Sequence, residues 1–200
     1  IAAIGSAIGA SFAGALGATS TSGPGLSLMG EFLNLAVIAE LPLVVIDVQR
    51  AGPSTGIPTK TEQSDLLQAL YGRHGESPLP VLAAATPADC FDTVVEASRI
   101  ALRYMTPVIV LSDLSLSSSA EVWREPEAAE LPAFTVHRVQ AGDAFQPYQR
   151  DPETLARPWA LPGTAGLEHV IGGLEKGGES GAVSYEPENH EAMVRLRQDK

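Results

Sequence analysis

An arginine stands where a run of apolar residues gives way to a polar loop. Arg50 follows residues 43–48 (LVVIDV) and one glutamine, and the hydroxyl side chain of Thr59 lies in the same loop. A guanidinium can hold a carboxylate with two parallel hydrogen bonds, and a nearby hydroxyl can add another donor. The position therefore favours binding of an anionic substrate. The alternative is that Arg50 forms an ion pair within the chain, with Asp47 or Glu62.

Two glycines flank a proline in an earlier loop, TSTSGPG (19–25), between a short predicted strand and a predicted helix. Gly23 and Gly25 permit another molecule to approach the backbone closely. The helix that follows would offer free N–H groups to an anion or a polar cofactor. A turn without any ligand is the alternative, because glycine-rich turns are common. Neither GxxxxGK[ST] nor GxGxxG occurs, so nucleotide phosphate binding has no specific support.

The other residues whose side chains could take part in catalysis or metal binding are isolated from one another. His74, in YGRHGE (71–76), could shuttle protons or bond to a carboxylate. Cys90 lies on a predicted amphipathic helix without a CxxC motif, and we interpret it as a small core residue. A single cysteine excludes a disulfide framework, a cysteine-ligated zinc site and a complete iron–sulfur ligand set. The absence of GxSxG weakens a serine hydrolase interpretation.

The elements that must position these loops alternate between strand and helix. We predict a short β-type segment at 18–21, apolar runs predict strands at 43–48, 81–85 and 107–111, and helical patterns cover 1–16, 26–39, 62–70 and 89–104. Apolar strands with short connections are typical of an α/β domain with a parallel sheet, which binds ligands at the carboxyl ends of its strands. We predict such a domain at 1–117, followed by a linker and turn-rich extension at 118–200.

Charge and composition exclude several classes of protein. The chain carries 24 acidic and 13 basic side chains, for a net charge of −11, which disfavours nucleic acid as a partner. Only five of the residues in 1–60 are charged, so we expect the rest of the chain or a partner subunit to cover this part. The apolar stretches 1–16 and 26–46 are too short or too polar for a membrane span, and we predict no membrane role.

Longer strings resemble a known enzyme family. They are TSGPGLSLMGE (21–31), DVQRAGPSTGIPTKTEQSDLLQALYGRHGE (47–76), TPVIVLSD (106–113), ARPWALPGTAGLEHVIGGLEK (156–176) and YEPENHEAMVRLR (185–197). In this order they resemble the alpha subunit of the 2-oxoacid:ferredoxin oxidoreductases, specifically of the 2-oxoglutarate (2-oxoacid) type. The similarity spans essentially the whole chain.

The resemblance implies a pyrimidine-binding domain for thiamine diphosphate, in which Arg50 holds the 2-oxoacid carboxylate and Thr59 hydrogen-bonds the substrate. It places Ser22, Gly23 and Gly25 beside the cofactor pocket. It assigns the diphosphate, its Mg²⁺ and a [4Fe–4S] cluster to a beta subunit. The complete cytoplasmic enzyme would decarboxylate a 2-oxoacid, pass electrons to ferredoxin and form an acyl-CoA from coenzyme A, or run in reverse.

Parts of the family pattern are missing from this chain. In the family a glutamate immediately precedes the stretch that matches Ile1, a YPITP-type motif lies further upstream, and a transketolase-like domain follows. We therefore expect the chain to be a piece of a longer protein. A pyruvate or branched-chain 2-oxoacid substrate is the alternative within the family. A non-catalytic α/β binding or assembly module, with no role for Arg50, is the alternative outside it.

Overall fold

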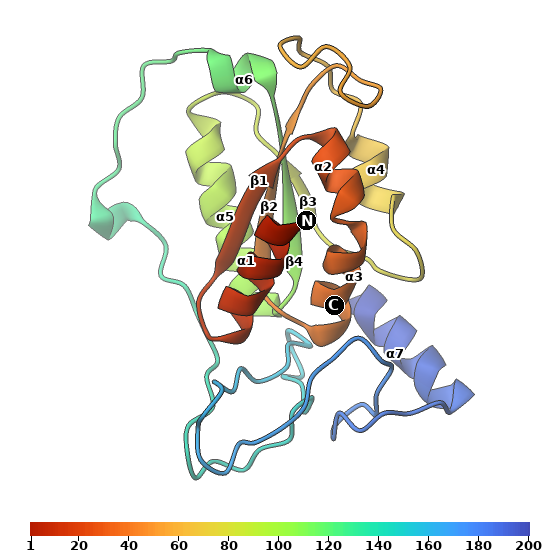
Figure 1. The fold of residues 1–200 in the computed structure, drawn as a ribbon. Coiled ribbons are helices and arrows are strands. Elements are labelled where there is room, and N and C mark those ends of the chain that lie inside the picture. The colour runs from red at the N-terminus through yellow and green to blue at the C-terminus, as the bar shows by residue number, and fades with distance from the viewer.

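A parallel sheet of four strands forms the centre of the computed structural model, which describes residues 1–200 (Figure 1). The strands are β1 (Gly17–Thr21), β2 (Leu43–Gln49), β3 (Val81–Ala83) and β4 (Pro107–Asp113), and their order across the sheet is β1-β2-β4-β3. Every neighbouring pair is parallel. The predicted α/β fold with a parallel sheet is confirmed.

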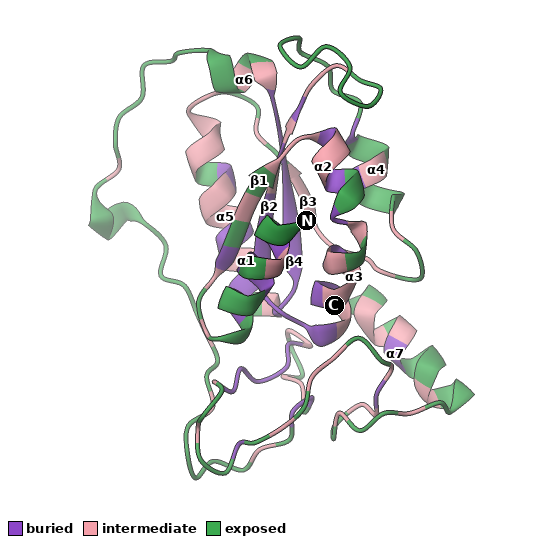
Figure 2. Ribbon diagram, viewed as in Figure 1, coloured by how far each residue is buried: buried purple, intermediate pink, exposed green.

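Helices cover both faces of this sheet (Figure 1). One face carries α1 (Ala2–Phe12), α2 (Gly23–Leu28), α3 (Gly30–Ala39) and α4 (Leu66–Tyr71), and the other carries α5 (Asp89–Tyr104). A hydrophobic core lies on each face of the sheet, and successive side chains of β2 point into opposite cores. Leu43 and Val45 pack against the helices α1 to α4, and Val44 packs against α5. Burial on both faces explains why β2 and β4 are nearly continuous apolar runs (Figure 2).

Two helices differ from the sequence prediction. The pattern predicts a helix over 62–70, but α4 begins only at Leu66, since the polar residues before it bond to the sheet and to the preceding loop. Gly23 to Gly25 of the SGPG segment form the first turn of α2, and Ser22 is its N-cap residue. A break at Met29 separates α2 from α3, where the periodicity predicts one helix over 26–39.

The second half of the chain contains little regular structure. After α6 (Leu114–Ser118), only the short 3₁₀-helix η1 (Ala128–Glu130) precedes α7 (Pro187–Asp199). Much of this extension lies at the end of the sheet where the strands begin, below the sheet in Figure 1. The division into domains at 1–117 and 118–200 stays a prediction. None of the helices combines the length and apolar character needed to cross a bilayer.

A buried carboxylate anchors the extension to the sheet domain. Glu40 follows α3 and is 3% exposed, and it pairs with Arg150 and with Lys200, whose Nζ is 2.5 Å from Glu40 Oε2. Arg157 donates to the Glu40 carbonyl oxygen at 3.0 Å, and Lys176 donates to the carbonyl oxygen of Ile38 at the same distance. Burial alone would raise the pKa of Glu40, but the charges of Lys200 and Arg150 outweigh it and lower that pKa. Four cations of the extension are thus fixed at the end of α3.

Candidate functional site

The carboxyl ends of the strands bring the predicted loops to one edge of the sheet. Thr21, the last residue of β1, pairs with Asp47 of β2, so the Ser22–Gly25 turn and the Arg50 loop leave neighbouring strands on the same side. Figure 1 shows both segments at the top of the view, where β4 also ends. The parallel direction of the strands produces this arrangement, and it is the edge where such domains bind ligands.

Arg50 has no carboxylate partner within the chain. Its side chain is half-buried, its Nε is buried without a hydrogen-bond acceptor, and it forms no ion pair. The alternative pairs do not form: Glu62 accepts a hydrogen bond from the Gly52 N–H at 2.9 Å, and Asp47 faces Asp65 instead. A guanidinium held at this edge without an anion is suited to binding one from outside the chain.

The loop that carries Arg50 closes on itself. The N–H of Ala51 donates to the Lys60 carbonyl at 2.9 Å, and the N–H of Ile57 donates to the Ala51 carbonyl at 3.1 Å. Thr59 lies within this closed loop with an exposed side chain. The structure thus holds Thr59 and Arg50 in one compact segment, and the roles predicted for them stay predictions.

Both glycines of the turn are required by packing within the chain. A Cβ at Gly23 would lie 2.7 Å from both carboxylate oxygens of Asp65, and a Cβ at Gly25 would lie 1.8 Å from the Thr21 hydroxyl. Gly23 is buried, whereas Ser22 and Gly25 are half-buried and reach the surface of the edge. Contact of Ser22, Gly23 and Gly25 with a cofactor stays a prediction.

A polar network that the sequence analysis missed fixes the end of the Arg50 loop. Gln49 accepts from the Asp65 N–H at 3.0 Å and donates to the Ser112 carbonyl at 3.2 Å. Gln63 donates to Asp113 at 2.6 Å, and the second oxygen of Asp113 accepts from the Leu116 N–H at 2.9 Å. The sequence did contain a signal for this network. The apolar runs LVVIDVQ and PVIVLSD both end in a polar residue, and a buried polar group needs a hydrogen-bond partner.

Asp47 and Asp65 form a buried carboxyl pair under the turn. They are 0% and 8% exposed, and no cation pairs with either. Burial, together with the adjacent carboxyl group of Asp65, raises the pKa of Asp47 to about 7. Asp47 therefore keeps its proton to higher pH than an ordinary aspartate, because burial and a neighbouring carboxyl group both disfavour its ionised form.

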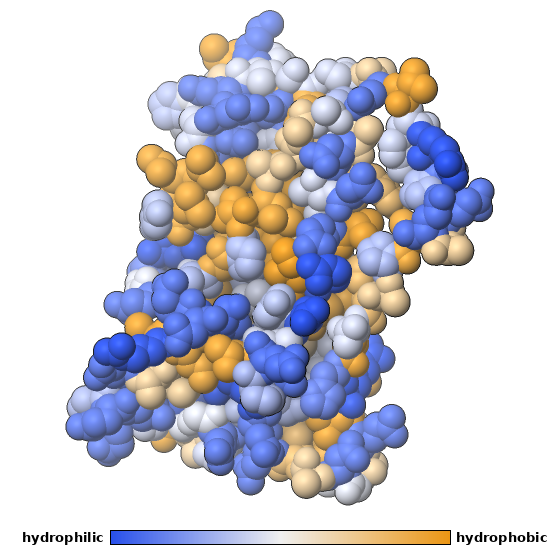
Figure 3. Space-filling model, turned by 180° about the vertical axis from the view of Figure 1, so that it is seen from behind, coloured by the Kyte–Doolittle hydropathy of each residue, from blue (hydrophilic) through white to orange (hydrophobic).

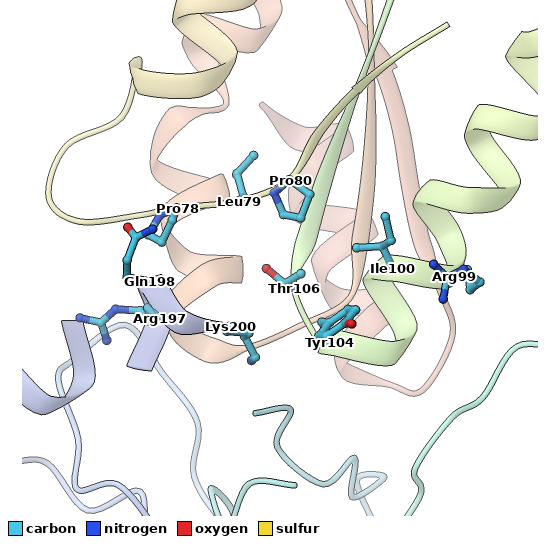
Figure 4. Close-up of a pocket in the computed structure, with 10 residues that line it drawn as sticks. All are labelled: Pro78, Leu79, Pro80, Arg99, Ile100, Tyr104, Thr106, Arg197, Gln198 and Lys200. Carbon is cyan, nitrogen blue, oxygen red and sulfur yellow. The ribbon is translucent and has the colours of Figure 1, made fainter. Parts of the chain in front are cut away.

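Cavities lie at both ends of the sheet. One of about 300 Å³ opens at the carboxyl edge, where Gln49, Gln63 and Asp113 supply polar groups to its wall. Another, of about 380 Å³, lies where β3 and β4 begin, between α5, α7 and the segment before β3 (Figure 4). Arg197 and Lys200 line this second cavity but already pair with Glu175 and Glu40. The first cavity shares its edge with Arg50, and the second does not.

His74 and Cys90 take no part in the site. The Nε2 atom of His74 is 3.4 Å from a carboxylate oxygen of Glu31, in keeping with the bond to a carboxylate that the sequence leaves open. Cys90 is a half-buried free cysteine near the start of α5. No group of three or more His, Cys, Asp or Glu side chains in the chain could hold a metal ion.

Comparison with known proteins assigns the family. The chain belongs to the thiamine diphosphate-binding domains of the pyruvate flavodoxin/ferredoxin oxidoreductases, whose family model matches residues 1–186. The predicted relation to the 2-oxoacid:ferredoxin oxidoreductases is thereby confirmed.

Two relatives named as subunits of 2-oxoglutarate enzymes are similar to this chain. The chain is 63% identical over 194 residues to the 2-oxoglutarate oxidoreductase subunit KorA of Mycobacterium tuberculosis, covering 97% of this chain and 30% of the relative. It is 50% identical over 134 residues to the 2-oxoglutarate synthase subunit KorA of Archaeoglobus fulgidus, covering 67% of this chain and 39% of that protein. The chain thus spans about a third of the length of these two relatives.

A solved structure has the same fold. The 2-oxoglutarate:ferredoxin oxidoreductase of Magnetococcus marinus, with 2-oxoglutarate, coenzyme A and succinyl-CoA bound, matches with a TM-score of 0.93 and 43% identity. The match covers 100% of this chain and 34% of that chain. The fold of this chain is therefore that of the corresponding domain in a 2-oxoglutarate oxidoreductase.

Proposed function

We propose that this chain is the pyrimidine-binding domain of the alpha subunit of a 2-oxoglutarate:ferredoxin oxidoreductase. The complete enzyme would convert a 2-oxoacid, coenzyme A and two oxidised ferredoxins into an acyl-CoA, CO₂, two reduced ferredoxins and a proton. The C1–C2 bond of the 2-oxoacid breaks, the acyl carbon forms a thioester with coenzyme A, and the two electrons pass singly to ferredoxin. Reductive carboxylation is the same reaction in reverse.

The unpaired Arg50 is the observation that carries this proposal. Its guanidinium would hold the C1 carboxylate of the 2-oxoacid through two hydrogen bonds, and the hydroxyl of Thr59 would add a donor. Arg50 has no competing carboxylate, so substrate binding would not have to break an existing ion pair. Fixing the carboxylate sets the orientation of the bond that breaks.

The Ser22–Gly25 turn fits the uncharged end of thiamine diphosphate. It presents a hydroxyl and backbone groups at the same edge as Arg50, and no charged side chain belongs to it. Thiamine diphosphate, when bound, supplies the electron sink that permits loss of CO₂. We assign the diphosphate, its Mg²⁺ and a [4Fe–4S] cluster to a beta subunit. This assignment is in keeping with a chain that has one cysteine and no cluster of metal-binding side chains.

An exposed apolar surface near the site supports a beta-subunit partner. Leu66, Leu67 and Tyr71 of α4 are 49%, 69% and 76% exposed, and Leu28 of α2 is 63% exposed. α2 and α4 are neighbours, because Gln68 donates to the Ser27 hydroxyl at 2.7 Å. Figure 3 shows apolar side chains gathered over α4 on the face opposite to the view of Figure 1. An apolar surface of this kind marks an interaction site in soluble proteins.

A panel of substrates tests the proposed function. The full-length subunit, purified with its beta subunit, is assayed for ferredoxin reduction with 2-oxoglutarate, pyruvate and a branched-chain 2-oxoacid, with and without coenzyme A and thiamine diphosphate. We expect the highest kcat/KM with 2-oxoglutarate and no reduction when either cofactor is omitted. Preference for another 2-oxoacid would establish the alternative substrate. Absence of turnover with all three would favour a non-catalytic module.

A further inference from the structure

The buried carboxyl pair connects three segments of the site. Asp47 belongs to β2, and Asp65 ends the Arg50 loop immediately before α4. The carboxylate of Asp65 occupies the space beside Gly23 that a Cβ would need, at 2.7 Å from its ideal position. Any movement of Asp65 therefore reaches both the loop that carries Arg50 and the turn that begins α2.

Asp65 does not form the contact that its position would ordinarily give it. An aspartate directly before a helix usually accepts a hydrogen bond from the first turn of that helix. The side chain of Asp65 makes no such capping bond to α4 and faces Asp47 instead, while its N–H is held by Gln49 at 3.0 Å. The first turn of α4 is therefore left without a side-chain cap, and the Asp65 carboxyl group lies beside that of Asp47 instead.

Only a proton can neutralise this pair. Neither oxygen of Asp47, nor Oδ2 of Asp65, accepts a hydrogen bond from any donor of the chain, and Asp65 is the one charged group that acts on Asp47. The residues that adjoin the pair from other elements are uncharged: Thr21 on β1, Leu111 on β4 and Gly23 on α2. Two buried carboxyl groups without a cation share a proton, because the charge-assisted O–H···O⁻ bond replaces their repulsion by attraction.

We propose that Asp47 and Asp65 are positioning residues, and that the proton they share fixes the Ser22–Gly25 turn and the Arg50 loop relative to each other. This inference rests on the proposed function, in which the turn faces the cofactor and the loop holds the 2-oxoacid. When the proton leaves, the two carboxylates repel, and Asp65 is free to turn toward the start of α4. The turn and the loop then lose their common contact.

The inference predicts a decline in substrate and cofactor binding as the pH rises through the pKa of Asp47, which is about 7. The expected rise in KM for 2-oxoglutarate is on the order of tenfold, the effect of losing one charge-assisted hydrogen bond. The change should fall on KM more than on kcat, because the pair positions the binding groups and does not touch the reacting atoms. Asp47→Asn should abolish the pH dependence, since its amide N–H donates to Asp65 at every pH.

Infrared spectroscopy of the full-length enzyme tests the shared proton directly. With isotope-labelled aspartate, the C=O stretching band of a protonated buried carboxyl group should be present at about pH 6 and lost by about pH 8.5. Asp47→Asn should remove the band at both values. Asp92→Asn, the same change at an exposed position on α5, should leave it intact. A spectrum in which Asp47→Asn removes no such band would overturn the inference.

Hydrogen–deuterium exchange tests the positioning role without any need for catalysis. In the wild-type enzyme, exchange of peptides covering 19–29 and 49–65 should rise at alkaline pH relative to Asp47→Asn at the same pH. Asp47→Ala should exchange fast at every pH because it restores no donor. Equal exchange in wild type and Asp47→Asn at alkaline pH would overturn the inference. If the enzyme turns over no 2-oxoacid at any pH, the proposed function fails, but the exchange comparison still decides this inference.

Discussion

Arg50→Lys is the perturbation whose outcome the structure defines most sharply. Lysine keeps the positive charge at the carboxyl end of β2 but loses the planar pair of N–H donors. If Arg50 holds the substrate carboxylate, the variant loses a charge-assisted contact of about 1.5–3 kcal/mol. That loss corresponds to a fall in kcat/KM for 2-oxoglutarate of roughly tenfold to a hundredfold.

The same structure predicts little effect of this substitution on folding. Arg50 forms no ion pair, and its Nε donates to no acceptor in the chain, so the substitution breaks no native ion pair. The free energy of unfolding should therefore change by about 0.5 kcal/mol or less, as for substitutions away from buried networks. Activity and stability should separate in this variant.

The assay measures kcat/KM by ferredoxin reduction and the free energy of unfolding by chemical denaturation in the same preparations. Arg99→Lys is the matched control: Arg99 on α5 pairs with Glu96, so a lysine there should leave kcat/KM unchanged. An Arg50→Lys enzyme with unchanged kcat/KM would refute the assignment. A loss of activity that merely follows a loss of stability would refute it as well.

Three further substitutions test other parts of the structure. Glu40→Gln should lower the free energy of unfolding by about 3–5 kcal/mol in chemical denaturation, because it leaves the buried cations Arg150 and Lys200 without a counter-charge. Gly25→Ala should lower the free energy of unfolding by about 1–3 kcal/mol, because its Cβ would overlap the Thr21 hydroxyl. Adding Thr21→Ala to the same chain should restore part of that loss. If the effects of the two substitutions simply add, the packing account is contradicted. Asp47→Asn should flatten the dependence of stability on pH. The folded-state pKa of Asp47 is raised to about 7, so the native state binds the extra proton between about pH 4 and 7, and wild-type stability should fall there by about 1 kcal/mol per pH unit and then level off.

The sheet could be predicted from the sequence because its two central strands are buried on both faces. The runs LVVIDV and PVIVL have no polar face to suggest any other element, and they became the central strands β2 and β4. Short connections between such strands leave few arrangements other than a parallel sheet with helices on its faces. The edge that carries Arg50 and the Ser22–Gly25 turn followed from that topology.

The contacts of the site could not be predicted because they depend on residues far apart in the chain. Gln63 bonds to Asp113 across fifty positions, and these tertiary contacts delay α4 until Leu66 although the local pattern favours an earlier start. Asp47 sits in an apolar run, where no local pattern indicates that Asp65 will join it. The packing of Asp65 against Gly23 and of Thr21 against Gly25 could not be predicted either, because no local pattern indicates which side chains fill the space beside a glycine.

A crystal structure of the complete enzyme with thiamine diphosphate and 2-oxoglutarate tests the central claim most directly. The account predicts both terminal nitrogens of Arg50, or one together with Nε, about 2.7–2.9 Å from the C1 carboxylate oxygens, as in bidentate pairs. It also predicts the Ser22–Gly25 turn in contact with the pyrimidine ring. A C1 carboxylate held by other residues, with Arg50 pointing away from it, would contradict the account.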